Sequence, residues 1–491
     1  MRKIILSLMA IMVLSSISRG QNLVLPDMLK GDMVLQQQTS ARIWGKAEPG
    51  SIVEVIPGWD LKTYSAKASV DSLWEIGVDT PKASYDAYSM TIRSGTEQLI
   101  VNDILIGEVW ICGGQSNMEM PLKGMSNCYV EGAAHDILMS GTHKGLRYMT
   151  VAKHKEKASC PGLLPEGKWH PSGPASAGDF SAVGYHFGAT LSEALGIPVG
   201  LINCSWGGSF LEDWVDSSFL AKHPDQKIFG AEFSKAYTQL YYGMLEPVSK
   251  YTIKGMIWYQ GESNVGSPDY DVRLADAVEL WSGKFQRNDF PFLIVELAPF
   301  EYSNGFEGHC AYFRELQFAA SKTIPSSGLV STNDLAYPYE TAMIHPANKK
   351  PVGQRLAMLA MSKTYGYGNP CEGPCFKEMS LEDGKAVLSF NNAPNGFMQT
   401  GEVIGFEIAG EDRIFHPAKA RFTVRFPQRP RPGEVRKPGE MSLRYGISLE
   451  SPEVANPVAV RYCFKDFQIG NVHNTEGFPL VPFRTDNWPV Q

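Results

Sequence analysis

Ser116 lies where an α/β enzyme can hold a nucleophile. It belongs to the hexapeptide Gly-Gly-Gln-Ser-Asn-Met at 113–118, which directly follows the apolar run 109–112. Glycines after a buried strand let the backbone turn sharply and leave room for a substrate carbonyl. A serine hydroxyl becomes a nucleophile when a neighbouring base removes its proton. Taken alone, the segment is equally consistent with an ordinary turn from a strand into a loop.

Three further polar segments follow strand-like runs. They are Ser-Trp-Gly-Gly-Ser at 205–209, Gln-Gly-Glu-Ser-Asn at 260–264, and a segment at 334–345 that ends in His345. The carboxyl ends of parallel strands meet at one edge of a sheet. Histidine is a base near neutral pH, and backbone N–H groups or side-chain amides stabilise an oxyanion. If their strands are neighbours, the four segments predict a serine hydrolase site.

Each segment also has a structural interpretation. Gly207 and Gly208 fit a simple turn, Glu262 fits a solvated loop residue, and His345 before a proline fits a structural histidine. The other histidines show no metal-ligand spacing such as His-x-x-x-His, so the sequence predicts no metal site. The sequence around Ser116 is not Gly-x-Ser-x-Gly, so the usual α/β-hydrolase elbow is not present there.

The alternation of strand-like and helical patterns over 107–368 predicts an α/β domain with a central parallel sheet flanked by helices. The strand-like runs lie at 108–112, 199–204, 255–259, 291–297 and 327–331, and helical patterns include 184–195 and 274–285. Residues 21–106 contain short β-branched or aromatic runs between turn signals, which predict an N-terminal β-sandwich. Residues 369–491 are β-rich again and predict a third, C-terminal domain.

Residues 1–20 have the pattern of a signal peptide. Arg2 and Lys3 precede an apolar run at 4–14, and Ser18 and Gly20 supply the small residues of a cleavage site. The apolar run is too short to span a bilayer. We therefore expect cleavage before position 21 and export to the periplasm or the exterior, with a short membrane anchor as the alternative.

The composition narrows the class of protein. A chain of 491 residues has room for two or three domains, and 43% hydrophobic with 20% charged residues indicates a globular protein. The net charge of -7 argues against a nucleic-acid partner, which would require a basic stripe. The eight cysteines have no zinc-site spacing. Cys371 and Cys375 are close enough to form a disulfide, whereas Cys112 and Cys204 lie in apolar runs and are expected to be buried thiols. Oligomeric state and disulfide connectivity cannot be read from the sequence.

The blocks resemble those of a known family. Residues 107–119 look like the first block of the sialate O-acetylesterase family, a branch of the SGNH hydrolases. Residues 205–214, 258–264 and 344–356 resemble its later blocks in the same order. Patterns at 33–36, 43–45 and 482–486 are also similar to this family, so the resemblance covers nearly the whole mature chain.

The resemblance implies roles for individual residues. Ser116 would be the nucleophile and would give its backbone N–H to an oxyanion hole, and Gly208 would give a second N–H. His345 would be the general base and then the acid for the leaving sugar oxygen. Members of the family are expected to need no metal and no organic cofactor.

A polar side chain of the third block would line the oxyanion hole or position the substrate. The candidates are Gln260, Glu262 and Asn264. Because an amide donates hydrogen bonds and an ionised carboxylate does not, we expect Gln260 or Asn264 in preference to Glu262.

The chain departs from the family pattern just before His345. Family members usually carry an aspartate two or three positions upstream, where this chain has Met343 and Ala342. Neither side chain offers the strong acceptor that a carboxylate provides. Glu340 is our candidate for the third member of the triad, with Asp334 or a backbone carbonyl as alternatives. If none of these groups replaces the aspartate, the alternatives are a Ser–His dyad with a reduced rate or a chain that has lost activity.

The resemblance therefore implies a secreted esterase that removes O-acetyl groups from sialic acids through an acetyl-Ser116 intermediate. Its expected partner is an O-acetylated sugar or glycan. One alternative substrate is acetylated xylan or another plant polysaccharide. A second alternative is a sugar-binding protein on a catalytically decayed hydrolase scaffold.

Overall fold

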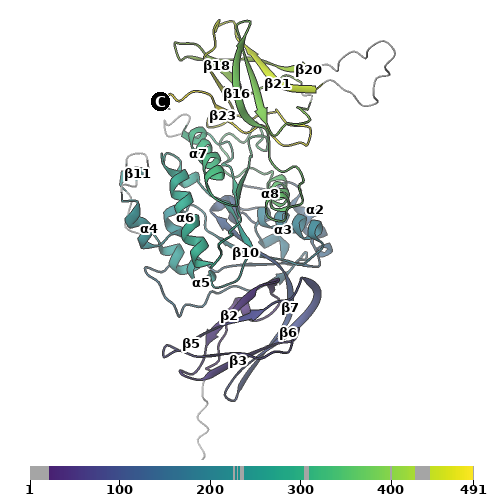
Figure 1. Ribbon diagram of the computed structural model, residues 1–491, viewed down its shortest axis with the longest axis vertical. Coiled ribbons are helices and arrows are strands. Elements are labelled where there is room, and N and C mark those ends of the chain that lie inside the picture. Colours follow the sequence, from purple (N-terminus) through teal and green to yellow (C-terminus); the bar gives the residue numbers. More distant parts are fainter. Residues whose placement is uncertain are drawn as a thin grey trace, which may run out of the picture.

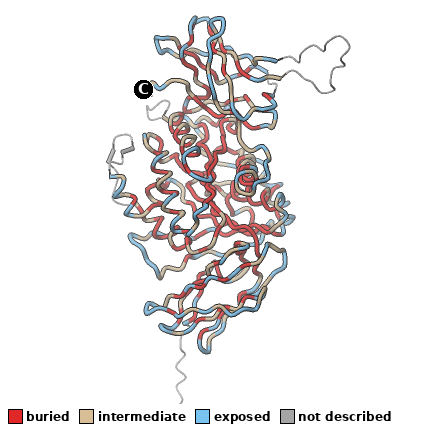
Figure 2. The backbone as a smooth tube through the Cα atoms, in the orientation of Figure 1, coloured by how far each residue is buried: buried red, intermediate tan, exposed pale blue. Residues whose placement is uncertain are grey.

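The computed structural model describes residues 22–224, 227–228, 231–232, 237–302, 309–398, 401–425 and 443–489. Figure 1 shows an α/β body between two β-rich regions, one N-terminal and one C-terminal. Buried residues, drawn in red, are most concentrated in the α/β body (Figure 2). The predicted signal peptide, residues 1–20, lies outside the described residues.

The N-terminal region is built mainly from antiparallel strands. β2 pairs with β5, and β3 pairs with both β4 and β6. In β5 buried and exposed residues alternate, as expected of a strand with one face on a core. Its short strands are β1 (Val34–Gln36), β2 (Ser40–Lys46), β3 (Ile52–Pro57), β4 (Tyr64–Lys67), β5 (Leu73–Asp79) and β6 (Ser84–Ser94).

One long strand, β7 (Glu97–Gly114), joins the N-terminal region to the α/β body. Its first half pairs antiparallel with β6, and its second half pairs parallel with β10 and β13. The expected boundary between residues 106 and 107 therefore falls inside a continuous strand.

The central sheet confirms the predicted fold class. Its strand order is β15-β14-β13-β7-β10-β8, with parallel pairing throughout and the short β9 (His170–Pro171) antiparallel at one edge. All residues of β10, β13, β14 and β15 are buried, because helices cover both faces. The parallel strands besides β7 are β8 (Leu146–Thr150), β10 (Val199–Ser205), β13 (Gly255–Tyr259), β14 (Phe292–Val295) and β15 (Ser327–Val330).

Alternate residues of β7 belong to two cores. Val109 and Ile111 pack in the core that includes Trp281 of α6, whereas Trp110 and Cys112 pack in the core that includes Phe187 of α3.

The principal helices are α3 (Ala182–Leu195), α6 (Tyr270–Lys284), α7 (His309–Thr323) and α8 (Lys350–Lys363). The shorter ones are α1 (Ser116–Glu119), α2 (Ala133–Met139), α4 (Ser217–Lys222) and α5 (Glu246–Val248), with single turns at η1 (Asp27–Leu29), η2 (Ser140–Thr142), η3 (Ala177–Asp179), η4 (Leu211–Trp214), η5 (Tyr241–Leu245) and η6 (Glu262–Asn264).

The C-terminal region contains two four-stranded sheets around a core of their own, in the orders β16-β17-β21-β20 and β19-β18-β22-β23. Their strands are β16 (Cys375–Glu382), β17 (Lys385–Asn391), β18 (Phe406–Ala409), β19 (Phe415–Pro417), β20 (Lys419–Arg425), β21 (Leu443–Glu450), β22 (Ala459–Tyr462) and β23 (Phe483–Arg484). A short hairpin, β11 (Lys227–Ile228) and β12 (Ala231–Glu232), lies in the α/β body.

All eight cysteines are free thiols, so Cys371 and Cys375 do not form a disulfide in this structure. Cys112 and Cys204 are buried, as the sequence predicts. Among the described residues, no helix combines the length and apolar character needed to cross a membrane.

Candidate active site

Ser116 lies at the carboxyl edge of the central sheet. β7 ends at Gly114, Gln115 caps the next helix, and Ser116 is the first residue of α1. Gly114 has a φ of 135°, and a Cβ on it would lie 2.1 Å from the carbonyl oxygen of Tyr259. Only glycine fits this left-handed, crowded position, so the glycine is what allows the strand to deliver Ser116 at the sheet edge.

The second segment packs against Ser116. β10 ends at Ser205, opposite Gly114 in the parallel pairing, and a Cβ on Gly207 would lie 3.3 Å from the Cβ of Ser116. The Gly207 N–H donates to Glu119 Oε2 at 2.5 Å, which ties this turn to α1. Gly208 has a φ of 75° and open space where its Cβ would be.

Two backbone donors near Ser116 remain free. Within the described ranges, neither the Ser116 N–H nor the Gly208 N–H has an acceptor. For Ser116 this follows from its place in the first turn of α1, where N–H groups have no intrahelical partner. Such donors are suited to an oxyanion.

The two amide side chains of the segment 260–264 bond to neighbouring loops. Gln260 is fully buried, and its Nε2 donates to Gln115 Oε1, to the Ser209 carbonyl and to Asn264 Oδ1, at 3.2, 3.1 and 2.7 Å. Asn264 is also fully buried, and its Nδ2 donates to Glu212 Oε2 at 2.9 Å. Because these donors already have partners, the structure does not aim either amide at Ser116.

Glu262 is the third-segment residue that reaches the helix of the serine. Its Oε1 accepts a 2.5 Å hydrogen bond from Asn117 Nδ2. Its Oε2 is buried and has no partner in the described part of the chain. Burial raises the pKa of this carboxyl, while the Asn117 hydrogen bond and the Lys349 charge oppose the shift.

Asn117 joins the serine segment to the histidine segment. Its Nδ2 also donates to the carbonyl oxygen of Ile344 at 2.9 Å, and its Oδ1 accepts from Lys349 Nζ at 2.5 Å. The residue after Ser116 is therefore bonded to the residue before His345. Asn117 was not predicted as a site residue from the sequence, although its position directly after Ser116 in the first block indicated that it would lie near the nucleophile.

His345 is half-buried, and its two ring nitrogens have different surroundings. Nδ1 lies 3.8 Å from Cys128 Sγ, whereas Nε2 is buried with no partner in the described ranges. Burial, and then the charge of Lys349, lower the pKa of His345 to about 4. The ring is therefore neutral near pH 7, the form in which it can accept a proton.

Ser116 and His345 lie on adjoining segments without a direct hydrogen bond between their side chains in the described structure. Such bonds are often long in substrate-free enzymes and shorten in the complex. Both residues are half-buried and neither is sealed in the interior.

Lys349 is a buried cation in the site. It is 1% exposed, and burial lowers its pKa to about 8, while Glu262 and Glu340 act in the opposite direction. Its ammonium lies 5.6 Å from the centre of the Tyr259 ring. Lys349 thus supplies positive charge beside Asn117 and His345.

The two carboxylates considered as partners of His345 are engaged elsewhere. Glu340 is fully buried and accepts from the N–H groups of Tyr337 and Ala347, at 2.8 and 2.9 Å. Asp334 pairs with Arg355 and with His473 Nε2. Glu340 therefore closes the loop that carries His345, and Asp334 lies in a different ion-pair cluster.

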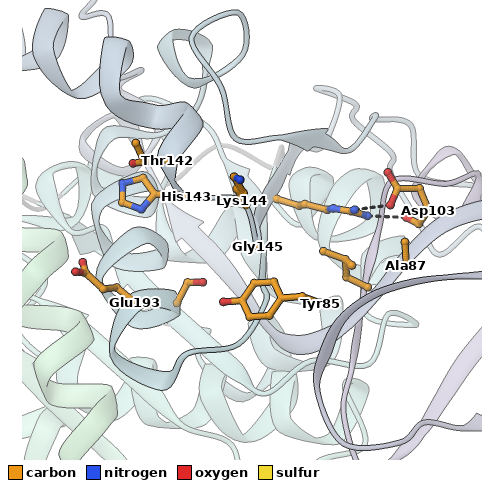
Figure 3. Close-up of a pocket in the computed structure, with 11 residues that line it drawn as sticks. Tyr85, Ala87, Asp103, Thr142, His143, Lys144, Gly145 and Glu193 are labelled. Atoms are coloured by element: carbon orange, nitrogen blue, oxygen red, sulfur yellow. Dashed lines mark hydrogen bonds and ion pairs between the residues drawn. The ribbon is translucent and has the colours of Figure 1, made fainter.

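A cavity of about 830 Å³ lies away from these residues. Figure 3 shows its lining residues, which include Tyr85 of β6, His143, and Glu193 of α3. Its lining includes residues at the amino end of β8 and near the end of α3, at the edge of the sheet opposite Ser116. None of the predicted site residues lines it.

In the described part of the chain, no group of three or more His, Cys, Asp or Glu side chains could hold a metal ion.

A parallel sheet flanked by helices, with a serine that follows a Gly-Gly turn at its carboxyl edge, is typical of α/β hydrolytic enzymes. Residues 106–362 match the family described as carbohydrate esterase, sialic acid-specific acetylesterase. The match covers more than half of the chain, and the protein belongs to this family of carboxylic ester hydrolases. The family resemblance in the sequence is thereby confirmed.

Characterised relatives span most of the chain. Human sialate O-acetylesterase is 28% identical over 399 residues, covering 74% of this chain and 75% of the human protein. The mouse sialate O-acetylesterase is 26% identical over 440 residues, covering 77% and 80%. The crystal structure of a carbohydrate acetylesterase from Xanthomonas citri is 32% identical, covers 95% of this chain and 100% of that one, and has a TM-score of 0.81.

Proposed function

We propose that the protein is an exported serine esterase that removes O-acetyl groups from sialic acids. The observation that carries this proposal is the pair of hydrogen bonds that Asn117 donates, one to Ile344 in the histidine segment and one to Glu262 in the segment 260–264. The sialate O-acetylesterases among the relatives support the choice of sugar.

In the first half of the proposed reaction, His345 takes the proton from Ser116 Oγ as this oxygen attacks the acetyl carbonyl carbon. The carbonyl oxygen becomes an oxyanion and accepts from the N–H groups of Ser116 and Gly208. As the intermediate collapses, the bond to the sugar oxygen breaks, and His345 gives its proton to that oxygen. The products are the free sugar hydroxyl and acetyl-Ser116.

In the second half, water replaces the sugar. His345 takes a proton from the water as it attacks the acetyl carbon, and then returns the proton to Ser116 Oγ. Acetate leaves and the free serine is restored. This proposal assigns each proton transfer to His345, whose lowered pKa of about 4 keeps it unprotonated between reaction cycles near pH 7.

The remaining predicted residues act through the scaffold in this proposal. Gln260 and Asn264 hold the loops around the serine, and Glu340 fixes the backbone on both sides of His345. Glu262 has a carboxyl oxygen without a partner in the described ranges and bonds to Asn117 through the other, so it is our candidate for contact with the substrate.

Export and domain organisation remain part of the proposal. Residues 1–20 would be removed on export. Residues 21–106 and 369–491 would flank a catalytic domain at 107–368 as separate modules.

Another glycan is the second candidate substrate. The Xanthomonas citri protein, described as a carbohydrate acetylesterase, is 32% identical to this chain, whereas the human sialate O-acetylesterase is 28% identical. A panel of 9-O-acetylated sialic acid, acetylated xylan and acetylated mannan separates the candidates. If kcat/KM for acetate release is highest with the sialic acid, the sialate proposal is supported. If it is highest with a polysaccharide, the polysaccharide replaces sialic acid as the proposed substrate.

Replacement of the nucleophile tests the reaction itself. We expect Ser116→Ala to lower kcat for acetate release by at least about 1,000-fold, because the covalent route is lost. The exposed Ser380→Ala in β16 is the matched control and should leave the rate unchanged. Undiminished release by Ser116→Ala would remove Ser116 from the mechanism. Sugar binding without acetate release by the unmodified protein would instead indicate the decayed scaffold.

A further inference from the structure

No carboxylate supports the imidazole of His345 in the described structure. Ala342 has no side-chain acceptor, and in the described ranges the His345 ring makes no hydrogen bond to the weakly accepting sulfur of Met343. Both oxygens of Glu340 already accept backbone N–H groups, and Asp334 is paired with Arg355. The ring nitrogen that an acid would normally hold must therefore have another partner.

The partner in the structure is a thiol. Cys128 Sγ lies 3.8 Å from His345 Nδ1, within reach of a hydrogen bond to sulfur. The two residues are 217 positions apart in the sequence. Cys128 follows α1 on the connection that begins with Ser116, so the nucleophile and this thiol belong to one stretch of chain.

The backbone fixes the position of this thiol. Cys128 and Met125 exchange two backbone hydrogen bonds of 2.9 Å each, which close a tight turn. Within the turn, Asn127 has a φ of 62°. Gly124 has a φ of 81°, and a Cβ on it would lie 2.7 Å from the carbonyl oxygen of Cys128. Because the turn fixes the Cα–Cβ direction of Cys128, Sγ is limited to the staggered χ1 positions, and in this structure it lies 3.8 Å from His345 Nδ1.

We propose that Cys128 is the positioning residue of the histidine, in the place where this family usually has an aspartate. This inference rests on the proposed esterase function. Sγ accepts the hydrogen of Nδ1, which leaves the lone pair on Nε2 for the proton of Ser116. Nε2 is buried and has no hydrogen-bond partner in the described ranges, so its lone pair is not engaged elsewhere.

The thiol differs from a carboxylate in strength. Sulfur is a weak acceptor, so it fixes the tautomer and the ring orientation but stabilises the imidazolium less than a carboxylate does. Lys349, whose ammonium interacts with both Cys128 and His345, also disfavours the imidazolium. A carboxylate at position 128 should therefore improve the site, a result that a purely structural role of Cys128 does not predict.

Kinetics of three variants test the inference. We expect Cys128→Ala to lower kcat by about tenfold at unchanged KM, the order of effect of one lost hydrogen bond in the transition state. Cys128→Asp should restore kcat to at least the unmodified value. Cys160→Ala, which removes an exposed cysteine, is the matched control and should leave kcat unchanged. Full kcat in Cys128→Ala, or a Cys128→Asp variant no faster than Cys128→Ala, would overturn the inference.

A spectroscopic measurement provides a second readout. In protein labelled with ¹⁵N-histidine, the signals of His345 are assigned by their loss in His345→Ala. We expect the unmodified protein to show the hydrogen on Nδ1, and Cys128→Ser, the variant closest in shape, to shift these signals. A hydrogen on Nε2 in the unmodified protein would overturn the inference even if no variant at 128 folds.

The two proposals can fail separately. If Ser116→Ala still releases acetate, the esterase mechanism fails, whereas the tautomer of His345 remains a direct test of the Cys128 contact. If Ser116→Ala is inactive and Cys128→Ala is fully active, the esterase mechanism stands and the role of Cys128 is overturned.

Discussion

At the scale of single residues, the buried ammonium of Lys349 connects the charges of the site. It donates to Asn117, and its charge lowers the pKa of His345. The charges of Glu262 and Glu340 favour its protonated form and oppose the lowering of its pKa by burial. The state of the histidine is therefore set by burial together with a cation that belongs to the same loop.

Removal of this cation should move the pH profile. In Lys349→Met, the acid limb of kcat/KM should shift to higher pH, because the charge that disfavours the imidazolium is gone. The limb should stay below about 6.5, the ordinary value for histidine, since burial is the larger cause of the lowered pKa. Rates from pH 3.5 to 8 on one acetylated substrate measure the shift.

Lys377→Met removes an equal charge from the exposed surface of the C-terminal region and serves as the control. An acid limb that is unchanged in Lys349→Met, or that moves equally in Lys377→Met, would contradict the electrostatic role of Lys349.

The sequence predicted the residues of the blocks but not their bonding partners. Ser116 and His345 stand out because their residue types and flanking glycines or proline suggest chemistry. The contact between Cys128 and His345 leaves no local pattern, because it joins segments 217 residues apart. The roles of Gln260 and Asn264 were also hidden, since only coordinates show that their donors already have partners.

At the scale of elements, hydrophobic runs located the strands well. The predicted 255–259 coincides with β13, and 199–204 differs from β10 by one residue. β7 was predicted only over 108–112 because its first half is a half-exposed strand of another region. The predicted helix at 274–285 begins earlier, at Tyr270, whose hydroxyl donates to Gln260 Oε1 at 2.7 Å. This tertiary hydrogen bond stabilises the first turn of α6, whose sequence has little amphipathic pattern.

The end of β7 is the element on which the position of Ser116 depends. Gly114→Ala should destabilise the protein by about 3 kcal/mol, since it combines left-handed strain with overpacking against Tyr259. Acetate release per folded molecule should also fall, because Ser116 is displaced. Urea unfolding and kinetics measure the two effects.

Gly173→Ala is the matched control, because a Cβ on Gly173 meets nothing within 4 Å and its φ is not left-handed. Equal stability of the two variants would show that the turn before Ser116 relaxes freely.

At the scale of the whole molecule, buried polar groups join the C-terminal region to the α/β body. Arg314 of α7 is 1% exposed and donates to the carbonyl oxygens of Cys463 and Lys465. Asp334 binds both Arg355 of α8 and His473 of the C-terminal region. The sequence offered Asp334 as a partner of His345. Its use in joining two regions could not be predicted, because Asp334 and His473 are 139 residues apart.

Two histidines with lowered pKa values link the stability of the molecule to pH. His186 of α3 is 4% exposed, and burial lowers its pKa to about 4. The carboxylate of Asp136 opposes this shift, and Lys350 and His143 add to it. His186 Nε2 lies 3.6 Å from Asp136 Oδ2, too far for a hydrogen bond to stabilise the protonated ring. His345 has a similarly lowered pKa.

In the unfolded chain each ring binds a proton near pH 6.5, whereas in the folded chain it binds one only near pH 4. Between pH 6.5 and pH 4 the unfolded state therefore holds more protons, and proton binding favours unfolding. The stabilisation is fully present above pH 6.5 and is lost as the pH falls towards 4. The urea midpoint should therefore decrease from pH 7 to pH 4.5, and His186→Gln should decrease less steeply. The exposed His170→Gln should follow the unmodified protein. Parallel pH dependence in His186→Gln would show that burial of this ring does not couple folding to protons.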